Sequence, residues 1–319
     1  MYYSIILCLI VSFIFVLLLK KNPKRSIKGK HVVITGGSSG IGKAMAILAA
    51  QQGAHVSLLA RNLEKLEEAR TEVKKHIISE EQIISRVSVD VSHREAVENN
   101  ILELETTVGP IYMLVNCAGF AVCGKLEDIS DSNIKRLIDV NYLGTLYPTK
   151  AVLPRFKERH EGIIVLTSSQ VGLMGMFGYS VYSSCKFALR GLAESLNMEV
   201  KPFNISITLA LPPDTDTPGF DNENQTKPVE TKLISEVAGL YQPETVAKKI
   251  MENALEGQFF SYLGFESFLL TTLCVGMSPY KSILGVLLQA VILGPFRLIA
   301  AFYLKYFDCI ILKVSKNNQ

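Results

Sequence analysis

The stretch HVVITGGSSGIGKAMAILAAQQGAHVSLLARN, at residues 31–62, limits the possible folds more than any other part of the chain. Short apolar runs open and close it, as buried strands do, and the small apolar residues between them indicate a packed helix. Gly36, Gly40 and Gly42 fall where the first strand turns into the helix. Glycines let the backbone approach a pyrophosphate, whose charge meets the free N–H groups at a helix N-terminus. The stretch therefore predicts a βαβ unit that binds a dinucleotide.

The end of the second strand indicates which dinucleotide binds. An acidic residue there would accept a hydrogen bond from a ribose 2′-hydroxyl group and favour NAD. The strand HVSLLA instead ends at Arg61, and Lys65 follows one helical turn later. Two cations suit a 2′-phosphate group, so we expect NADPH. The competing interpretation is that Arg61 is only a surface residue at a helix start.

Short apolar strands alternate with helical segments up to about residue 210. This alternation is typical of a parallel sheet covered on both faces, with ligand sites at the carboxyl ends of the strands. The expected fold class is α/β, a Rossmann-type doubly wound parallel sheet with helices on both faces. Asp90 ends the third strand and is expected to contact the adenine, although helix capping is the competing explanation.

Tyr182 and Lys186 are four residues apart at the start of a segment with helical apolar spacing. On a helix they lie on one face, so the ammonium group is expected to lower the pKa of the phenol from its usual value near ~10. A phenol tuned in this way can exchange a proton with a substrate oxygen. Ser169, thirteen residues before Tyr182, is placed to hydrogen-bond the same oxygen.

Composition excludes several classes of function. The net charge of +3 is too small to indicate nucleic acid binding. The six cysteines and five histidines are dispersed without metal-ligand spacing, so we expect no metal site, and a reduced compartment fits better than a disulfide framework.

Both ends of the chain indicate a membrane. Residues 2–19 are uncharged and long enough for a span, and six basic residues follow between 20 and 30. Positive charge behind the apolar run favours an uncleaved anchor with the following domain on the cytoplasmic side; a cleaved signal peptide is the alternative. Near the C-terminus, apolar runs at 267–279, 283–296 and 298–304 are each shorter than a comfortable span. We expect a helical hairpin dipping into the membrane, or helices lying at its surface, rather than full crossings.

Taken together, these motifs resemble the short-chain dehydrogenase/reductase family over about residues 30–255. The matching segments are TGGSSGIG at 35–42, NCAG at 116–119, Asn141, Ser169 and the YSSCK segment at 182–186. The resemblance implies that Asn141, Ser169, Tyr182 and Lys186 are catalytic, with Ser168 as the alternative serine. Two departures are Cys117 inside NCAG and a Pro-Pro pair at 212–213, after which Thr215 and Thr217 are the expected hydroxyl contacts to the nicotinamide. The expected cofactor contacts are Gly36, Ser38, Ser39, Gly40, Ile41, Gly42, Arg61, Lys65, Asp90, Val91, Asn116, Tyr182, Lys186, Thr215 and Thr217.

Within the family, the segment PPDTDTPGFDNENQTKP at 212–228 is most similar to members that reduce 3-oxosphinganine to sphinganine. The resemblance implies a long-chain keto-amine lipid as substrate and NADPH as cofactor. It also implies the endoplasmic reticulum membrane, with the catalytic domain facing the cytosol, and a homo-oligomer that is a dimer or a tetramer. The alternatives are a membrane-bound reductase of steroids, retinoids or other lipid ketones, and a non-catalytic NADPH-binding membrane scaffold. The expected division is an anchor at 1–19, a basic flank at 20–30, the reductase domain at 31–257, membrane-associated helices at 258–312 and a tail at 313–319.

Overall fold

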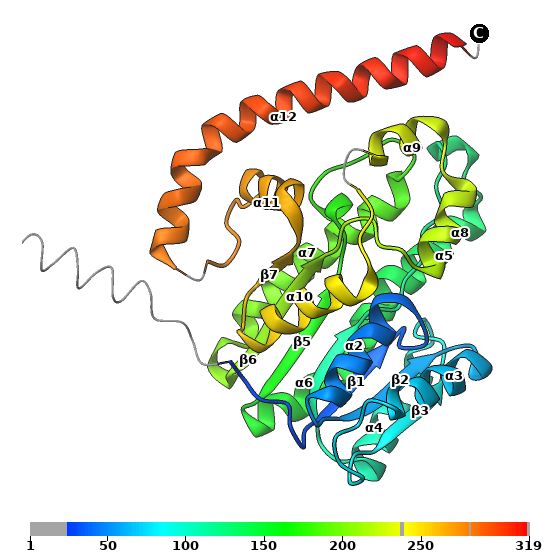
Figure 1. Cartoon of the computed structure of the whole chain (residues 1–319), viewed down its shortest axis with the longest axis vertical. Coiled ribbons are helices and arrows are strands. Elements are labelled where there is room, and N and C mark those ends of the chain that lie inside the picture. Colours follow the sequence, from blue (N-terminus) through cyan, green and yellow to red (C-terminus); the bar gives the residue numbers. More distant parts are fainter. Residues whose placement is uncertain (1–23, 237–238, 281, 318–319) are drawn as a thin grey trace, which may run out of the picture.

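The computed structural model describes residues 24–236, 239–280 and 282–317. The expected anchor at 1–19 and the first part of the basic flank lie outside the described residues. Within them, one parallel sheet has the strand order β3-β2-β1-β4-β5-β6-β7 (Figure 1). The strands are β1 (His31–Thr35), β2 (His55–Ala60), β3 (Ile84–Ser88), β4 (Ile111–Asn116), β5 (Gly162–Thr167), β6 (Ile205–Leu211) and β7 (Phe260–Tyr262). The strand order reverses between β1 and β4, which is where a sheet of this type opens its ligand crevice.

Helices cover both faces of the sheet, so the expected doubly wound α/β fold is confirmed. The helices are α2 (Gly40–Gln51), α3 (Leu63–Lys74), α4 (Arg94–Thr107), α5 (Asp131–Ile138), α6 (Gly144–Arg159), α7 (Ser180–Glu199), α8 (Pro218–Thr226), α9 (Val229–Ser235), α10 (Pro243–Leu255), α11 (Gly264–Leu273) and α12 (Ile283–Asn317). Shorter helical segments are η1 (Leu126–Asp128), the π-helix η2 (Asp139–Leu143), η3 (Gln170–Gly172) and η4 (Lys201–Phe203).

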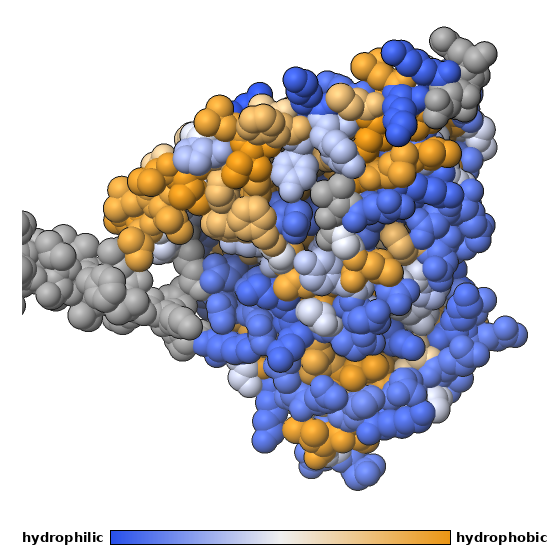
Figure 2. All heavy atoms as spheres, turned by 45° about the horizontal axis from the view of Figure 1, so that its top comes forward, coloured by the Kyte–Doolittle hydropathy of each residue, from blue (hydrophilic) through white to orange (hydrophobic). Residues whose placement is uncertain are grey.

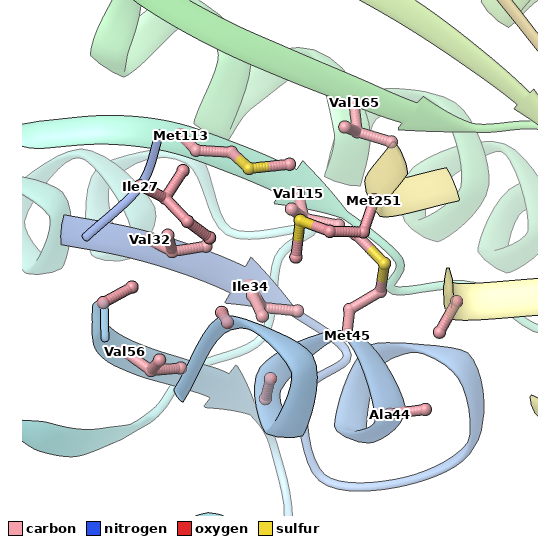
Figure 3. Close-up of a cluster of buried hydrophobic side chains, with 14 of the residues drawn as sticks. Ile27, Val32, Ile34, Ala44, Met45, Val56, Met113, Val115, Val165 and Met251 are labelled. Carbon is pink, nitrogen blue, oxygen red and sulfur yellow. The ribbon is translucent and has the colours of Figure 1, made fainter. Parts of the chain in front are cut away.

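Alternate side chains of each strand enter opposite halves of the core, as the strand period requires. On one face, Val32 and Ile34 of β1 pack beneath α2, α3 and α10. Figure 3 shows Met45 of α2 and Met251 of α10 meeting over this face. On the other face, Val33 packs with side chains of α4, α6 and α7. The two layers hold the strand ends, and the loops that follow them, in fixed positions.

The sheet extends beyond the expected limits of the reductase domain. Strand β7 pairs in parallel with β6, although the sequence placed residues after 257 in the membrane-associated part. At the other end, Ile27 is buried in the core, and the guanidinium group of Arg25 donates to the carbonyl oxygen of Gly162 across 3.1 Å. Part of the basic flank is therefore built into the domain.

The C-terminal apolar runs differ most from expectation. Residues 283–317 form the single helix α12, which continues through Pro295 and into the expected tail. Among the described residues, one helical stretch, Ile283–Lys316, is both long enough and apolar enough to cross a membrane, and its mean hydropathy is 2.0. The runs at 283–296 and 298–304 are therefore parts of one helix and not separate short segments. Figure 1 shows that α12 bends in its first half and lies across α11 and α9, and a proline inside a helix is the usual cause of such a bend.

Candidate active site and nucleotide crevice

Lys186 is held near the carboxyl end of β5. Its ammonium group donates a hydrogen bond to the carbonyl oxygen of Thr167 across 3.0 Å, and its Nζ lies 5.4 Å from the centre of the Tyr182 ring. The side chain is buried, and this burial lowers the pKa of Lys186 to about 8. The helical spacing of Tyr182 and Lys186 therefore brings the two side chains together on α7, as the sequence predicts.

The pKa of Tyr182 differs from the sequence-based expectation. Burial raises the pKa of this phenol well above its usual value, and the nearby carboxylates of Glu223 and Asp214 raise it further. Desolvation and negative charge both disfavour a phenolate, and here they outweigh the ammonium group of Lys186. The expectation of a lowered pKa is wrong for this structure. A phenol that keeps its proton at neutral pH is suited to act as an acid.

The adjacent serines face different partners. The hydroxyl group of Ser168 donates to the main-chain carbonyl of Lys186 across 2.9 Å, which ties β5 to α7. Ser169 begins η3, where its Oγ accepts a hydrogen bond from the N–H of Val171 across 3.4 Å. Within the described part of the chain the Ser169 hydroxyl donates to no protein acceptor, so its proton is available for a substrate oxygen, whereas that of Ser168 is already used.

Asn141 lies in the π-helix η2, fully buried. Its Nδ2 donates to the carbonyl oxygens of Phe120 and Leu137, at 2.9 and 3.0 Å. A Cβ atom placed on Gly119 would lie 2.9 Å from Asn141 Oδ1 and 3.5 Å from Lys186 Nζ. Glycine at this position leaves the space between the amide and the ammonium group open. Such π-segments are frequent at functional sites.

The glycine turn after β1 has the geometry that its residues predict. Gly36 has φ +68°, and a Cβ atom there would lie 2.7 Å from the backbone nitrogen of Ala118. At Gly42 it would lie 2.4 Å from the carbonyl oxygen of Gly36. These contacts leave no room for a side chain.

The N-terminus of α2 suits an anion. Ser38 and Ser39 immediately precede the helix, whose first turn contains no acidic residue, and within the described residues the Ser39 side chain makes no capping hydrogen bond. Free N–H groups and unengaged hydroxyls are the donors that a pyrophosphate needs. This part of the crevice therefore fits a dinucleotide.

Arg61, at the end of β2, lies beside Asp90. Its Nη1 is 3.9 Å from Asp90 Oδ2, and the Arg61 side chain is exposed. Burial opposes ionisation of Asp90, but hydrogen bonds from Ser92 and the charge of Arg61 outweigh it and lower the pKa of the carboxyl group. Lys65 is also exposed, on the first turn of α3, and Val91 is buried against Gly144.

Two predicted cofactor contacts are already engaged within the protein. Asn116 is buried, and its Nδ2 donates to Thr149 Oγ1 and to the carbonyl oxygen of Val165. Its side chain thus joins β4 to β5 and α6, and does not line the cavity described below. Thr215 donates its hydroxyl proton to the carbonyl oxygen of Pro213 across 2.8 Å, so it is not a free donor for the nicotinamide. The contacts of these two residues with the cofactor stay predictions.

Thr217 is better placed. Its Oγ1 accepts from the N–H of Phe220 across 3.1 Å and so caps α8, which leaves its own proton available. A Cβ atom on Gly40 would lie 2.9 Å from Thr217 Cγ2. The glycine turn and the loop after β6 therefore meet at Thr217.

A cavity of about 530 Å³ opens beside these residues. It contains several of the predicted site residues, namely Ile41, Ser168, Ser169, Tyr182, Lys186, Thr215 and Thr217. Other predicted site residues do not line it, among them Gly36, Gly40, Gly42, Arg61, Lys65, Asp90 and Asn141. Leu269 and Leu273 of α11, with Ala300, Leu304 and Phe307 of α12, line a different part of its wall. We call the part of the wall around Ser169, Tyr182 and Lys186 the polar end; the lining side chains of α11 and α12 are mostly apolar, with Glu266 and Arg297 as the charged exceptions.

Sequence reasoning missed a charged cluster at the polar end. Asp214 and Glu223 line the cavity, and both form ion pairs with Lys227, whose Nζ lies 3.6 Å from Asp214 Oδ2 and 2.9 Å from Glu223 Oε1. The hydroxyl group of Tyr179 donates to Glu223. The signal was present, because Thr217 followed by Pro218 is a typical helix start and places Glu223 and Lys227 one turn apart.

The fold and the site geometry agree with a match to the family model described as short chain dehydrogenase, which covers residues 30–228. The chain belongs to the short-chain dehydrogenase family. As a member of this family, it is an oxidoreductase that uses a nicotinamide cofactor.

Curated relatives within the short-chain dehydrogenase family match almost the whole chain. The 3-ketodihydrosphingosine reductase of Bos taurus is 50% identical over 307 residues, covering 95% of this chain and 92% of the relative. The 3-dehydrosphinganine reductase of Danio rerio is 48% identical over 313 residues, covering 96% and 94%. Among solved structures, levodione reductase superposes with a TM-score of 0.67 at 22% identity, covering 74% of this chain and 96% of that one, which shows the shared fold.

Proposed function

We propose that this chain reduces 3-oxosphinganine to sphinganine, with NADPH as the hydride donor, at a membrane surface. The observation that carries the proposal is the two-ended cavity, with Tyr182 and Ser169 at its polar end and apolar side chains of α11 and α12 along the rest. A long-chain amino ketone has the same division, because its reacting carbonyl is next to a polar head and its remainder is hydrocarbon. The names of the relatives support this substrate.

The reaction adds a hydride to the carbonyl carbon and a proton to the carbonyl oxygen, which converts the ketone to a secondary alcohol. The nicotinamide supplies the hydride. Tyr182 donates the proton, and its raised pKa keeps that proton in place until the oxygen gains negative charge. Ser169 donates a hydrogen bond to the same oxygen and orients the carbonyl. Lys186, held by Thr167, places positive charge beside the phenolate that remains.

Asn141 is proposed to help return a proton to Lys186 and Tyr182 after each reaction. The space beside Gly119, between Asn141 Oδ1 and Lys186 Nζ, is bordered by an acceptor and a donor. A water molecule needs such partners to occupy a buried position. Asn141 is therefore a positioning residue in this proposal.

NADPH is favoured over NADH by the charges at the end of β2. Arg61 and Lys65 are both exposed there, and Asp90 is 3.9 Å from Arg61 and ionised. We propose that Arg61 and Lys65 bind the 2′-phosphate and that Asp90 accepts from the adenine amino group. The backbone around Ser38, Ser39 and Ile41 is proposed to hold the pyrophosphate.

The outer face of α12 supports contact with lipid. Val291 and Phe302 are each 75% exposed, and Figure 2 shows apolar side chains gathered over α11 and α12 while the surface below is largely hydrophilic. We propose that α12 lies against the membrane with this face in the lipid, while Ala300, Leu304 and Phe307 face the cavity. The basic flank favours a cytosolic catalytic domain, and the resemblance to reductases of this substrate implies the endoplasmic reticulum membrane.

The test is NADPH oxidation by membranes that contain the full-length chain, supplied with 3-oxosphinganine or with a ketosteroid. Turnover of 3-oxosphinganine and little turnover of the steroid support the proposal; the reverse preference assigns the site to another lipid ketone. Tyr182→Phe separates catalysis from binding, because it removes the proton and leaves the NADPH contacts. Loss of turnover by about 100-fold or more with NADPH binding retained is expected. Wild-type turnover in this variant removes Tyr182 from the role of acid.

A further inference from the structure

The polar end of the cavity contains more negative charge than the reduction of a carbonyl requires. Asp214 lies in the loop after β6 and Glu223 lies on α8, and both line the cavity. Lys227 is their shared cation, with a side chain that is 1% exposed. Two carboxylates and one ammonium group leave one negative charge uncompensated within this cluster.

The cations that line the cavity are Lys186 and Arg297, and among the described residues neither forms an ion pair with Asp214 or Glu223. Lys186 donates to the carbonyl oxygen of Thr167. Arg297 belongs to α12, and Glu266 of α11 also lines the cavity. The uncompensated charge therefore remains with Asp214 and Glu223. Because charge in a partly buried site is costly without a partner, this position favours a cationic ligand group.

The carboxylates lie close to the reacting centre. The hydroxyl group of Tyr179 donates to Glu223, and the ring of Tyr179 is 5.7 Å from that of Tyr182, centre to centre. Both carboxylates act on the phenol of Tyr182, whose pKa they raise. The negative charge is therefore adjacent to the place where Tyr182 meets a carbonyl oxygen.

We infer that Asp214 and Glu223 form a subsite for the ammonium group of the substrate, next to the carbonyl that is reduced. The inference rests on the proposed function and extends it to the recognition of the amine. In a 2-amino ketone the nitrogen is two covalent bonds from the carbonyl carbon, roughly 2.5 Å away. A carboxylate beside Tyr182 is therefore in reach of the nitrogen while the oxygen meets the phenol.

The two carboxylates differ in how far they are already satisfied. Glu223 has close contacts with Lys227 and Tyr179, and its side chain is 14% exposed. Asp214 is 3.6 Å from Lys227 and 29% exposed, and burial raises the pKa of its carboxyl group to about 6. A cation that binds here stabilises the ionised form of Asp214. Asp214 is thus the direct contact of the ammonium group, and Glu223 completes the negative site.

The test compares two ketones of equal chain length, 3-oxosphinganine and the corresponding ketone without the 2-amino group, by NADPH oxidation with the full-length chain in detergent. The variants are Asp214→Asn and Glu223→Gln, each of which keeps its shape and loses its charge. Asp221→Asn is the matched control, because Asp221 is an exposed acid on the same helix, α8, outside the cavity. NADPH affinity is measured for every variant as a check on the fold.

We expect KM for the amino ketone to rise about 10-fold to 100-fold in Asp214→Asn and Glu223→Gln. A change in turnover that acts through the pKa of Tyr182 affects both ketones alike, so the decisive quantity is the ratio of kcat/KM for the amino ketone to kcat/KM for the ketone without the amine, which should fall about 10-fold or more. The control should keep the wild-type preference. The inference is overturned if both variants bind NADPH and still prefer the amino ketone as strongly as wild type does. If Glu223→Gln loses NADPH binding because Lys227 lacks a partner, Asp214→Asn decides.

The wild-type chain alone separates this inference from the proposed function. Equal efficiency with both ketones overturns the ammonium subsite and leaves the reductase function standing. No turnover of either ketone, with NADPH bound, overturns the proposed function itself. If the wild-type chain prefers the amino ketone and the two variants lose this preference, the result supports the proposed function and the ammonium subsite together.

Discussion

The hydroxyl group of Ser168 donates to the main-chain carbonyl of Lys186 across 2.9 Å, so one serine of an adjacent pair fixes the helix that carries the proton donor. The other, Ser169, keeps its proton for the cavity. The two are neighbours in the chain and have different tasks in the site.

This division predicts opposite effects of two alanine substitutions. Ser169→Ala should lower kcat by about 100-fold, because it removes a donor to the developing oxyanion, with little change in stability. Ser168→Ala should lower the free energy of unfolding by about 1–2 kcal/mol, because it removes a buried hydrogen bond between the end of β5 and α7, and should keep most of the turnover. Steady-state kinetics and urea unfolding in detergent measure the two effects. A larger loss of kcat in Ser168→Ala reverses the assignment.

Arg61 is predicted to discriminate between the cofactors. Arg61→Ala should raise KM for NADPH about 10-fold to 100-fold and leave KM for NADH nearly unchanged, because only NADPH carries the 2′-phosphate. Its contact with Asp90 is 3.9 Å long and exposed, so stability should change little. The measurement is initial rate against each cofactor. An equal change in both KM values contradicts a phosphate contact.

Because the His31 side chain is buried, we predict that the protein loses stability in mild acid. The ring nitrogens of His31 contact the carbonyl oxygen of Gly109 and the hydroxyl group of Ser57, and burial lowers its pKa from 6.5 to about 4. The unfolded chain takes up this proton near pH 6.5 and the folded chain only near pH 4. Stability is therefore full above pH 6.5 and is lost as pH falls towards 4, by about 2 kcal/mol between pH 7 and pH 5.

The control for this prediction is His31→Gln, which keeps polar contacts and cannot titrate. Urea unfolding of both proteins at pH 7 and pH 5 gives the comparison. The variant should be less stable at pH 7 but lose less on acidification. An equal loss in the two proteins assigns the acid sensitivity to other groups.

The outer face of α12 predicts the strength of membrane binding. Val291→Glu and Phe302→Glu should each lower the partition onto phospholipid vesicles by about 10-fold or more, since a charge replaces an exposed apolar side chain at the lipid. Ile78→Glu is the matched control, because Ile78 is 59% exposed and lies far along the chain from α12. Vesicle flotation of the full-length chain measures the effect. Similar losses in all three variants would point to general insolubility instead.

The sheet and the catalytic helix were predictable because their signals are local. Alternating strands and helices, the glycine turn and the spacing of Tyr182 and Lys186 all lie within short stretches of sequence. The direction of the Tyr182 pKa was not predictable, since it depends first on the burial of the phenol and then on the charges of Glu223 and Asp214, which are distant in sequence and approach it only in the fold. The partners of the Asn116 side chain, Thr149 and Val165, are likewise tertiary contacts.

The C-terminal third was misjudged for a different reason. Pro295 and Arg297 divide the apolar sequence, and a proline ordinarily ends or kinks a helix. The structure keeps the helix continuous through this point, so the runs at 283–296 and 298–304 become one element. Strand β7 has three residues, too few for a period-2 pattern to be recognised, and only its pairing with β6 reveals it.

Helix α12 presents Leu304 to the cavity and Phe302 to the outside of the molecule. A hydrocarbon chain that enters along this helix moves by lateral diffusion from the apolar interior of the bilayer into the apolar wall of the cavity. Leaving through water would instead cost about 0.8 kcal/mol for every methylene group wetted. Product release in this enzyme is therefore expected to deliver the alcohol back to the leaflet from which the ketone came.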